Sequence, residues 1–274
     1  MSITKTSYAP LCRVFVNRFG LSILTCALAA IGSSAMAATT WNFSTCNSTA
    51  GAQSGGVNFG NSWSCAGAAG TNKVTASAWG GANITGSTGF QTAYLSPQGS
   101  SGFGVASRYE TIAVSSPNHA ADNSPTNPTP DLVVLKFDTA VSLSSVRLGW
   151  MSGDADFTLM AYNGAGAPSV LGKNASNLTT GWALVENSAG STAGTRSVNA
   201  GEVVSSWWLI SAYSSSYGGG YLDSNKDYFK LLSVASRDVT QTSSVPEPGS
   251  LALLGAGLIG MMASRRRSRA QQAD

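Results

Sequence analysis

The chain has 274 residues, and only 11% of them are charged, whereas about 25% is usual in soluble proteins. Its single histidine excludes a metal site built from several imidazoles, and 43% hydrophobic residues with seven tryptophans argue against disorder. The 31 glycines and the low content of Lys, Arg and Glu exclude a long coiled coil.

Residues 1–37 have the arrangement of a secretory signal peptide. A basic segment precedes an uncharged apolar run at 19–31, and small residues follow it. Ala35 and Ala37 form the A-x-A pattern, so we expect cleavage before Ala38 and export through the Sec translocon. An N-terminal membrane anchor is the alternative, but the apolar run is shorter than the ~20 residues that span a bilayer.

Most of the positive charge belongs to the two ends of the chain. The full sequence has a formal net charge of +3, whereas residues 38–245 contain nine basic and eleven acidic side chains and therefore carry −2. A nucleic-acid-binding surface requires a basic patch. We therefore expect no nucleic-acid partner.

Two of the four cysteines, Cys46 and Cys65, remain once the signal peptide is removed. An even pair in an exported protein predicts a disulfide. It would close a loop of about 20 residues and contribute about 3 kcal/mol in the chain-entropy model. Two free thiols are the alternative, because a zinc site needs more ligands than these cysteines and one histidine provide.

Residues 38–244 are predicted to form a single all-β domain of the β-sandwich or jelly-roll type. Turn residues punctuate this segment, and short alternating or continuous apolar runs lie between them. The run 157–162 is apolar at nearly every position, which is typical of a central strand, whereas 116–130 is predicted to be a long loop. The expected strands lie at 74–78, 132–137, 146–150, 157–162, 203–213 and 228–234, with weaker candidates at 103–107 and 182–185.

His119 is the only imidazole base that the chain offers for hydrolytic chemistry, and Asp122 follows it three residues later. A Ser-His-Asp hydrolase also needs an activated serine, and no G-x-S-x-G motif marks one. We therefore expect His119 to bond to the backbone or to Asp122, and we assign no catalytic residue.

Two acidic patterns could hold a structural Ca²⁺. Asp223, Asn225 and Asp227 have the D-x-N-x-D spacing of a calcium loop, but the glycine and the bidentate glutamate of that loop are missing. Asp154 and Asp156 flank one alanine at the start of a strand and could point the same way. The alternative is that these residues cap their own turns. No other cofactor is expected.

Five aromatic residues surround the turn with the sequence SSSYGGGY, and exposed rings of this kind can stack on sugars. Alternate side chains of a strand face opposite sides, so at least half of the five must lie in the core. The cluster consists of Trp207, Trp208, Tyr213, Tyr217 and Tyr221.

Residues 245–274 form a second targeting segment with three parts. Val245, Pro246, Glu247 and Pro248 form an extended motif, because proline fixes φ and removes a backbone donor. The apolar run 250–263 predicts a short transmembrane helix. A basic cluster then keeps the C-terminus in the cytoplasm by the positive-inside rule. The cluster consists of Arg265, Arg266, Arg267 and Arg269.

This motif, helix and arginine cluster together resemble the PEP-CTERM sorting signal of exosortase substrates in Gram-negative bacteria. The resemblance implies transient anchoring in the inner membrane, cleavage by exosortase near the motif, and delivery to the cell surface or extracellular matrix. The core is also similar to a family of exosortase-dependent surface proteins. This resemblance implies a location at the cell surface, and it implies no activity. The similar segments lie at 117–123, 131–137, 148–150, 153–157 and 227–231.

The sequence therefore predicts an exported, exosortase-processed protein of the cell surface or matrix that has no catalytic activity. A polysaccharide-binding module on the cell surface, associated with exopolysaccharide, is the alternative. A secreted hydrolase is the second alternative.

Overall fold

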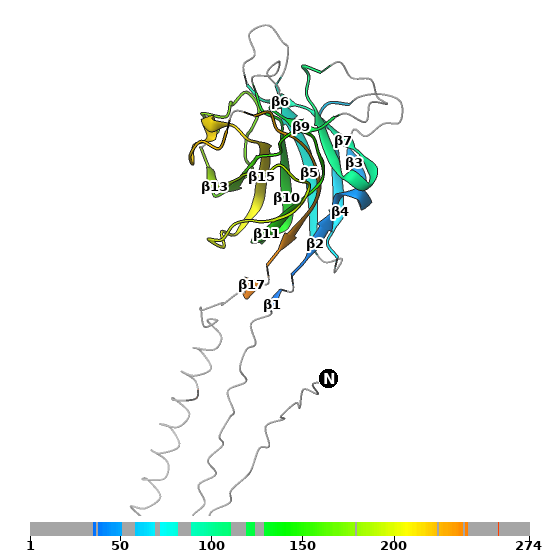
Figure 1. Cartoon of the computed structure of the whole chain (residues 1–274). Helices are drawn as coiled ribbons and strands as arrows, with labels where there is room; N and C mark the ends of the chain where they lie inside the picture. The colour runs from blue at the N-terminus through cyan, green and yellow to red at the C-terminus, as the bar shows by residue number, and fades with distance from the viewer. Residues whose placement is uncertain are drawn as a thin grey trace, which may run out of the picture. The chain divides into compact units, whose positions relative to one another are not determined.

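The computed structural model describes most of the segment between residues 35 and 240 (Figure 1). The chain divides into two units, one of which runs from Ala35 to Gln241, while the other combines the two chain ends. Of the second unit only Gly257 is described, and it is helical. The described residues are 35–36, 38–50, 58–68, 72–81, 89–110, 119–123, 129–178, 180–223, 225–237, 239–240 and 257.

Two antiparallel sheets make up the first unit, so the all-β prediction is confirmed. The eight-stranded sheet runs in the order β13 (Trp182–Ser188), β12 (Phe157–Tyr162), β15 (Ser205–Ala212), β10 (Leu132–Val141), β5 (Lys73–Gly80), β4 (Ser62–Ala66) and β3 (Asn47–Ala50), and β6 (Gln91–Thr92) pairs with β5. The seven-stranded sheet runs in the order β14 (Gly194–Ser197), β11 (Leu143–Met151), β16 (Tyr228–Ser236), β8 (Phe103–Ala106) and β7 (Tyr94–Pro97), and β2 (Thr40–Asn42) and β9 (Ala121–Asp122) pair with β16.

A short ribbon and three 3-10 helices complete the described elements. The ribbon pairs β1 (Ala35–Met36) with β17 (Val239–Thr240). The 3-10 helices are η1 (Phe43–Thr45), η2 (Gly99–Ser101) and η3 (Ser215–Tyr217).

One hydrophobic core lies between the two sheets, which gives the unit a sandwich-like arrangement. Phe157 on β12 packs edge to face against Phe229 on β16, with ring centroids 6.2 Å apart. Trp41 on β2 does the same with Phe137 on β10 at 4.8 Å. Each pair joins one sheet to the other. All four side chains are buried, so the aromatic contacts add to the hydrophobic stabilisation of the core.

A second hydrophobic cluster covers the other face of the eight-stranded sheet. Leu132, Met160 and Leu209 point away from the main core and pack with residues of the connecting loops, such as Leu178. This double burial explains why β12 is apolar at nearly every position, and it confirms the prediction of a central strand at 157–162.

The disulfide between Cys46 and Cys65 is present and confirms the predicted pairing. Cys46 follows η1, and Cys65 lies on β4 with its side chain in the core. The bond therefore fixes the N-terminal segment of the domain to the eight-stranded sheet.

One sequence-based expectation about the loops was wrong. The segment 116–130 was expected to be a continuous loop, but it contains β9, whose Ala121 and Asp122 pair with Phe229 and Tyr228 of β16. Backbone pairing with a distant strand produces β9, and two residues carry no periodicity that would reveal it.

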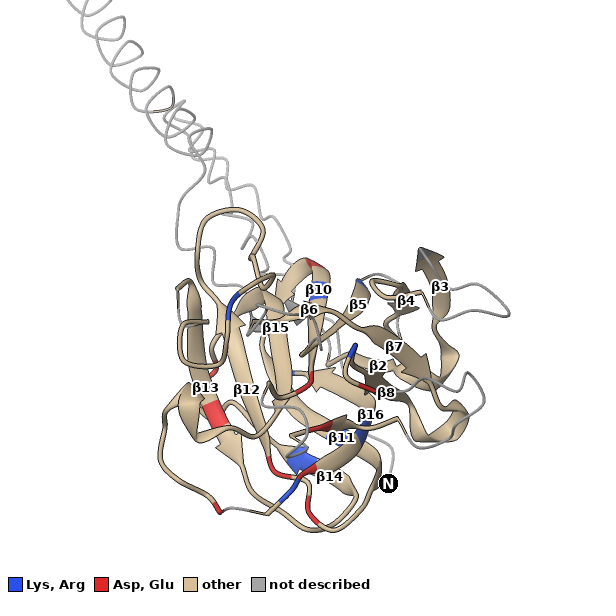
Figure 2. Cartoon of the chain, turned by 90° about the horizontal axis from the view of Figure 1, so that it is seen from above, with Lys and Arg blue, Asp and Glu red and all other residues tan. Residues whose placement is uncertain are grey.

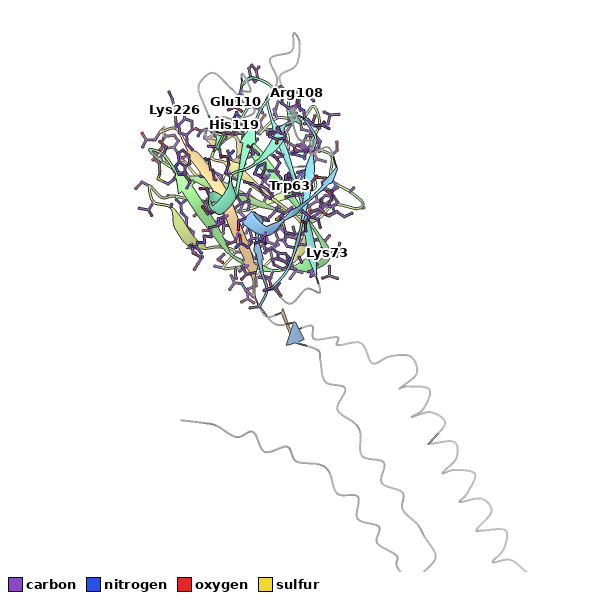
Figure 3. All side chains as sticks on the ribbon, turned by 90° about the vertical axis from the view of Figure 1, so that its right-hand side faces the viewer. Trp63, Lys73, Arg108, Glu110, His119 and Lys226 are labelled. Atoms are coloured by element: carbon purple, nitrogen blue, oxygen red, sulfur yellow. A yellow bond between two sulfur atoms is a disulfide. The ribbon has the colours of Figure 1, made fainter. Side chains whose placement is uncertain are left out.

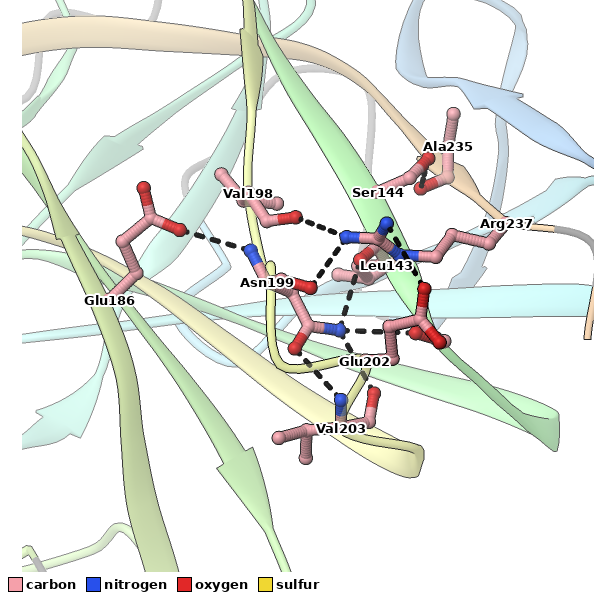
Figure 4. Close-up of polar contacts among 10 residues, drawn as sticks. Leu143, Ser144, Glu186, Val198, Asn199, Glu202, Val203, Ala235 and Arg237 are labelled. Atoms are coloured by element: carbon pink, nitrogen blue, oxygen red, sulfur yellow. Dashed lines mark hydrogen bonds and ion pairs between the residues drawn. The ribbon is translucent and has the colours of Figure 1, made fainter.

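Asn199 holds the corner at which the chain passes from the eight-stranded to the seven-stranded sheet (Figure 4). Its amide donates to Ser142 Oγ, to the carbonyl of Leu143 and to the carbonyl of Val203. Its Oδ1 accepts from the backbone of Val203. Arg237, at the end of β16, donates to the Asn199 carbonyl, so the same corner also fixes the end of the last long strand.

We expect Asn199→Ala to lower the free energy of unfolding by about 2–4 kcal/mol. The substitution leaves buried carbonyls without a donor, and it places alanine at a backbone position with positive φ, where it is strained. The φ of Asn199 is 57°, in the left-handed region that asparagine tolerates better than alanine. Urea unfolding followed by tryptophan fluorescence measures the difference. The exposed Asn58→Ala is the control and should change stability by less than about 0.5 kcal/mol. An equally small effect at Asn199 would contradict the assignment.

Candidate functional site

Three aspartates from two distant segments meet at one end of the sandwich. Asp154 and Asp156 lie in the connection from β11 to β12, and Asp227 immediately precedes β16. Asp154 and Asp227 form an isolated parallel bridge, in which the Tyr228 amide donates to the Asp154 carbonyl at 2.9 Å. The Asp156 amide donates to Asp227 Oδ1 at 2.6 Å. The backbone therefore fixes the relative positions of all three carboxylates.

The three carboxylates form a compact cluster of oxygens. Each offers one oxygen, and these oxygens lie within 4.8 Å of one another. All three residues are buried, with exposed fractions of 9% for Asp154 and 1% each for Asp156 and Asp227. Seen from above, Asp and Glu segments lie beside β11 and β14 at this part of the molecule (Figure 2).

Backbone and amide donors satisfy most of these oxygens, but not all of them. Asp156 Oδ1 accepts from the Gly190 amide at 2.7 Å, and Asp227 Oδ2 accepts from the side-chain amide of Asn123 at 2.5 Å. The amide nitrogen of Asp227 in turn donates to Asn123 Oδ1. Asp156 Oδ2 is buried and has no hydrogen-bond partner.

Burial and mutual repulsion oppose the ionised state of the cluster. Burial, with the Asp156 and Asp154 charges added, raises the pKa of Asp227 to about 7, although the hydrogen bond from the Asp156 amide lowers it. Burial also raises the pKa of Asp156, against the lowering effect of the Gly190 amide. The site therefore favours a ligand or a proton that reduces its negative charge.

Arg196 on β14 is a nearby cation that also positions the loop around Asp156. Its guanidinium donates to the carbonyls of Ala155 and Gly190 at 2.7 Å and more weakly to those of Ser188 and Thr192. These four bonds go to backbone oxygens, so the positive charge acts on the carboxylates by electrostatic attraction at a distance. Burial lowers the pKa of Arg196, while the carboxylate of Asp156 raises it.

An open cavity of about 630 Å³ adjoins the cluster at Asp154. Most of its lining residues have polar side chains, and Tyr228 contributes an aromatic ring. The lining residues are Ser152, Gly153, Asp154, Ser191, Asn225, Lys226 and Tyr228. Figure 3 shows Lys226 near one end of the molecule, with His119 and Glu110 toward the same end.

The structure merges the two acidic patterns of the sequence into one site. Asp154, Asp156 and Asp227 converge, and Asn225 lies at the rim with its amide 3.4 Å from Asp154 Oδ2. Asp223 behaves differently, because its Oδ1 accepts from the Asn225 backbone at 2.8 Å and so caps its own turn. Capping was the alternative interpretation of these residues. It describes Asp223, and it also describes one oxygen of Asp154, because Asp154 Oδ1 accepts from the Ala155 amide at 2.8 Å.

Sequence reasoning did not identify three neighbours that shape this site, namely Asn123, Gly190 and Arg196. Asn123 ties Asp227 to the Tyr213 carbonyl. These residues are far from the aspartates in sequence and belong to no local motif, so no signal in a single sequence marks them.

Most of the predicted aromatic cluster lies in the interior. Trp208, Tyr213 and Tyr217 are buried, which confirms that at least half of the five belong to the core. The Tyr213 hydroxyl donates to the Gly220 carbonyl and accepts from the Leu222 amide, so it braces the glycine-rich turn. Trp207 is half-buried, and Tyr221 is 68% exposed.

His119 faces Glu110, whereas the sequence predicted a bond to the backbone or to Asp122. Its Nδ1 lies 3.6 Å from Glu110 Oε1, and both the histidine and Asp122 are 7% exposed. The Ser107 amide donates to the other oxygen of Glu110. This arrangement links the segment after β8 to the segment before β9.

Most residues of the two targeting segments lie outside the described residues. They include Ala37, the motif Val245, Pro246, Glu247 and Pro248, and Arg265, Arg266, Arg267 and Arg269. Ala35 lies on β1, and Ala38 is exposed just before the buried Thr39. Among the described residues there is no helix with the length and hydropathy needed to cross a membrane.

Comparison with known proteins identifies the C-terminal segment. Residues 244–267 match the family model described as the PEP-CTERM protein-sorting motif. The chain therefore carries this sorting signal, which indicates export and exosortase-dependent targeting to the cell surface. Neither the curated proteins nor the solved structures gave a match.

We expect Arg196→Lys to destabilise the domain by about 2–3 kcal/mol, because lysine keeps the charge but loses the forked set of hydrogen bonds to carbonyls. Thermal unfolding at pH 7 measures the loss. Arg147→Lys, on the exposed side of β11, is the matched control and should be nearly neutral. Equal stability of the two variants would show that Arg196 acts through its charge alone.

Proposed function

We propose that this chain is an exported, non-catalytic protein that exosortase processes and that is then displayed on the cell surface or in the extracellular matrix. The PEP-CTERM sorting motif at 244–267 carries this proposal. The folded unit that precedes it is a disulfide-linked β-domain, which suits an oxidising extracellular compartment.

In this proposal a signal peptide ending at Ala37 starts export, and the apolar run 250–263 anchors the precursor in the inner membrane. A helix of this length would extend about 21 Å, which is shorter than the bilayer core of about 30 Å. The motif from Val245 to Pro248 is thus held close to the membrane surface, within reach of a membrane-embedded protease.

The direction of β16 separates the aspartate cluster from the point where the two chain ends leave the domain. β16 has nine residues, beginning beside Asp227 and ending at Ser236, and extends about 30 Å. At its far end the Ser236 amide donates to the Thr39 carbonyl, so both chain ends leave the domain there. Figure 1 shows β1 and β17 at one end and β9, which pairs with the start of β16, at the other. The aspartate cluster therefore lies at the opposite end of the domain from the point where the two chain ends leave it.

We expect simultaneous replacement of Pro246, Glu247 and Pro248 by alanine to block processing and leave a membrane-retained precursor. The physical reason is that alanines let the membrane helix extend into the motif, which removes the extended backbone that a protease binds. Fractionation followed by immunoblotting in an exosortase-positive host measures the outcome, and N-terminal sequencing of the delivered protein should begin at Ala38.

The matched control is a triple alanine replacement of residues 241–243, just upstream of the matched motif, which should leave delivery unchanged. Replacing the four arginines at 265–267 and 269 should instead allow the C-terminal segment to cross the inner membrane, so that unprocessed protein is released into the periplasm. Normal surface delivery of the Pro246–Pro248 variant would contradict the proposal and indicate an ordinary anchor.

A second candidate function, polysaccharide binding, is favoured by the cavity beside Asp154. Its hydroxyl, carboxylate, amide and amine groups can hydrogen-bond to sugar hydroxyls, and the Tyr228 ring offers an apolar face for a pyranose. This location differs from the aromatic cluster that the sequence indicated, most of which is buried.

We expect the exported protein to bind the exopolysaccharide of its own producer, and Lys226→Ala together with Tyr228→Ala to weaken this binding at least about tenfold, since each removes a contact that desolvates on binding. Tyr221→Ala is the control, because Tyr221 is the exposed member of the original cluster. Pulldown with the purified polysaccharide measures retention. Loss of binding in the Tyr221 variant alone would place the site at the glycine-rich turn instead.

A further inference from the structure

We propose that Asp154, Asp156 and Asp227 bind one calcium ion that fixes the end of the sandwich opposite the chain termini. The proposal concerns a metal site and depends neither on exosortase nor on a polysaccharide. It stands on the geometry of three buried carboxylates and on one buried oxygen that lacks a partner.

The unpartnered oxygen is Asp156 Oδ2. Asp156 is 1% exposed, and its other oxygen is taken by the Gly190 amide. A buried carboxylate oxygen without a donor is costly, because it loses hydration without compensation. A cation shared with Asp154 and Asp227 would supply the missing interaction.

The spacing of the carboxylates suits an ion of the size of Ca²⁺. Oxygens that bind one Ca²⁺ at 2.3–2.6 Å lie at most about 4.6–5.2 Å apart, and the three aspartates present oxygens within 4.8 Å of one another. Small rotations of the carboxylates would bring all three oxygens to bonding distance of one ion without a change of the backbone, which hydrogen bonds already hold.

The donor set identifies the class of the ligand. The three side chains supply only oxygen, which selects hard cations over zinc or copper. Asn225 extends this set, because rotation of its side-chain amide would turn Oδ1 toward Asp154 in place of the nitrogen that now lies 3.4 Å from it. The adjoining cavity gives an entry path and room for water to complete the six to eight ligands of calcium.

The ion would join connections that the sheets alone leave separate. Asp154 and Asp156 belong to the β11–β12 connection, and Asp227 ends the β15–β16 connection. Gly190 brings in the β13–β14 loop through Asp156, and Asn123 brings in the segment after β9 through Asp227. Calcium binding should therefore stabilise the fold at this end and also shape the cavity wall at Asp154.

The competing interpretation needs no metal. In it, a proton together with the field of Arg196 balances the cluster, as the hydrogen bonds of Arg196 to neighbouring carbonyls permit. The two interpretations differ in one measurable respect, because only bound calcium makes stability depend on the calcium concentration at constant pH.

The test uses the full chain purified in detergent, unfolded thermally at pH 7 in EGTA, in CaCl₂ and in MgCl₂. At a calcium concentration about a hundredfold above Kd, we expect the Tm to rise by about 5–10 °C relative to EGTA, with a much smaller rise in Mg²⁺. Calorimetric titration should give one ion per chain, with a Kd of about 10⁻⁴–10⁻³ M, as in extracellular calcium modules.

Asp156→Asn should abolish the calcium-dependent shift while leaving the Tm in EGTA unchanged or higher, because it removes one of three clustered charges. Asp138→Asn, at an exposed position of β10, is the matched control and should keep the full shift. If Asp156→Asn does not fold, Asp154→Asn replaces it, since Asp154 is the least buried of the three.

Three results would overturn the proposal. A wild-type Tm that is the same in EGTA and in 10 mM CaCl₂ would exclude calcium binding. An equal shift in Mg²⁺ would exclude a site selective for calcium. A full shift retained by the aspartate-cluster variants, as in Asp138→Asn, would place the ion elsewhere.

Discussion

The pairing of β16 is the constraint on which the rest of the domain depends. This strand pairs with β11 along one edge and with β8, β9 and β2 along the other, and its Phe229, Leu231 and Val234 fill the core. It begins at Tyr228, directly after Asp227, and ends at Ser236, whose amide donates to the Thr39 carbonyl. A single strand thus runs from the aspartate cluster to the point where the chain continues toward the sorting signal. The length of β16 sets the distance between the cluster and that point.

The same strand explains why carboxylates are tolerated in the interior. The sheet orders the backbone around Asp154 and Asp227 through the bridge between them and the Tyr228 hydrogen bond. Amides from Asp156, Gly190 and Asn123 then aim at the carboxylates without further loss of entropy, because packing has already fixed them. Such preorganised donors offset part of the desolvation cost. The uncompensated part falls on Asp156 Oδ2, which makes this oxygen the chemically distinctive atom of the site.

The sequence predicted the elements whose signal is local. The strands at 132–137, 157–162 and 228–234 were recognised because their own side chains enter the core. The disulfide followed from counting cysteines. The sequence could not reveal β9 or β14, since distant strands impose their conformation and their residues carry little apolar pattern. The sequence also indicated the five candidate calcium ligands. Only the topology of the chain decides that Asp227 lies beside Asp154 while Asp223 caps its own turn.

The placement of polar chemistry at one end follows from how the sandwich is closed. At the end where the chain enters and leaves, Asn199 and Arg237 donate hydrogen bonds to the backbone carbonyls of the corner, although Arg237 Nε itself has no partner (Figure 4). At the opposite end one buried carboxylate oxygen, Asp156 Oδ2, lacks a donor, and an open cavity adjoins the cluster at Asp154. The unpartnered atom at the first end is a donor of a cationic side chain, whereas at the second end it is a carboxylate oxygen, which a cation can bind. A cation or a polyhydroxylated ligand would find its polar partners at this second end, through the cavity that adjoins Asp154.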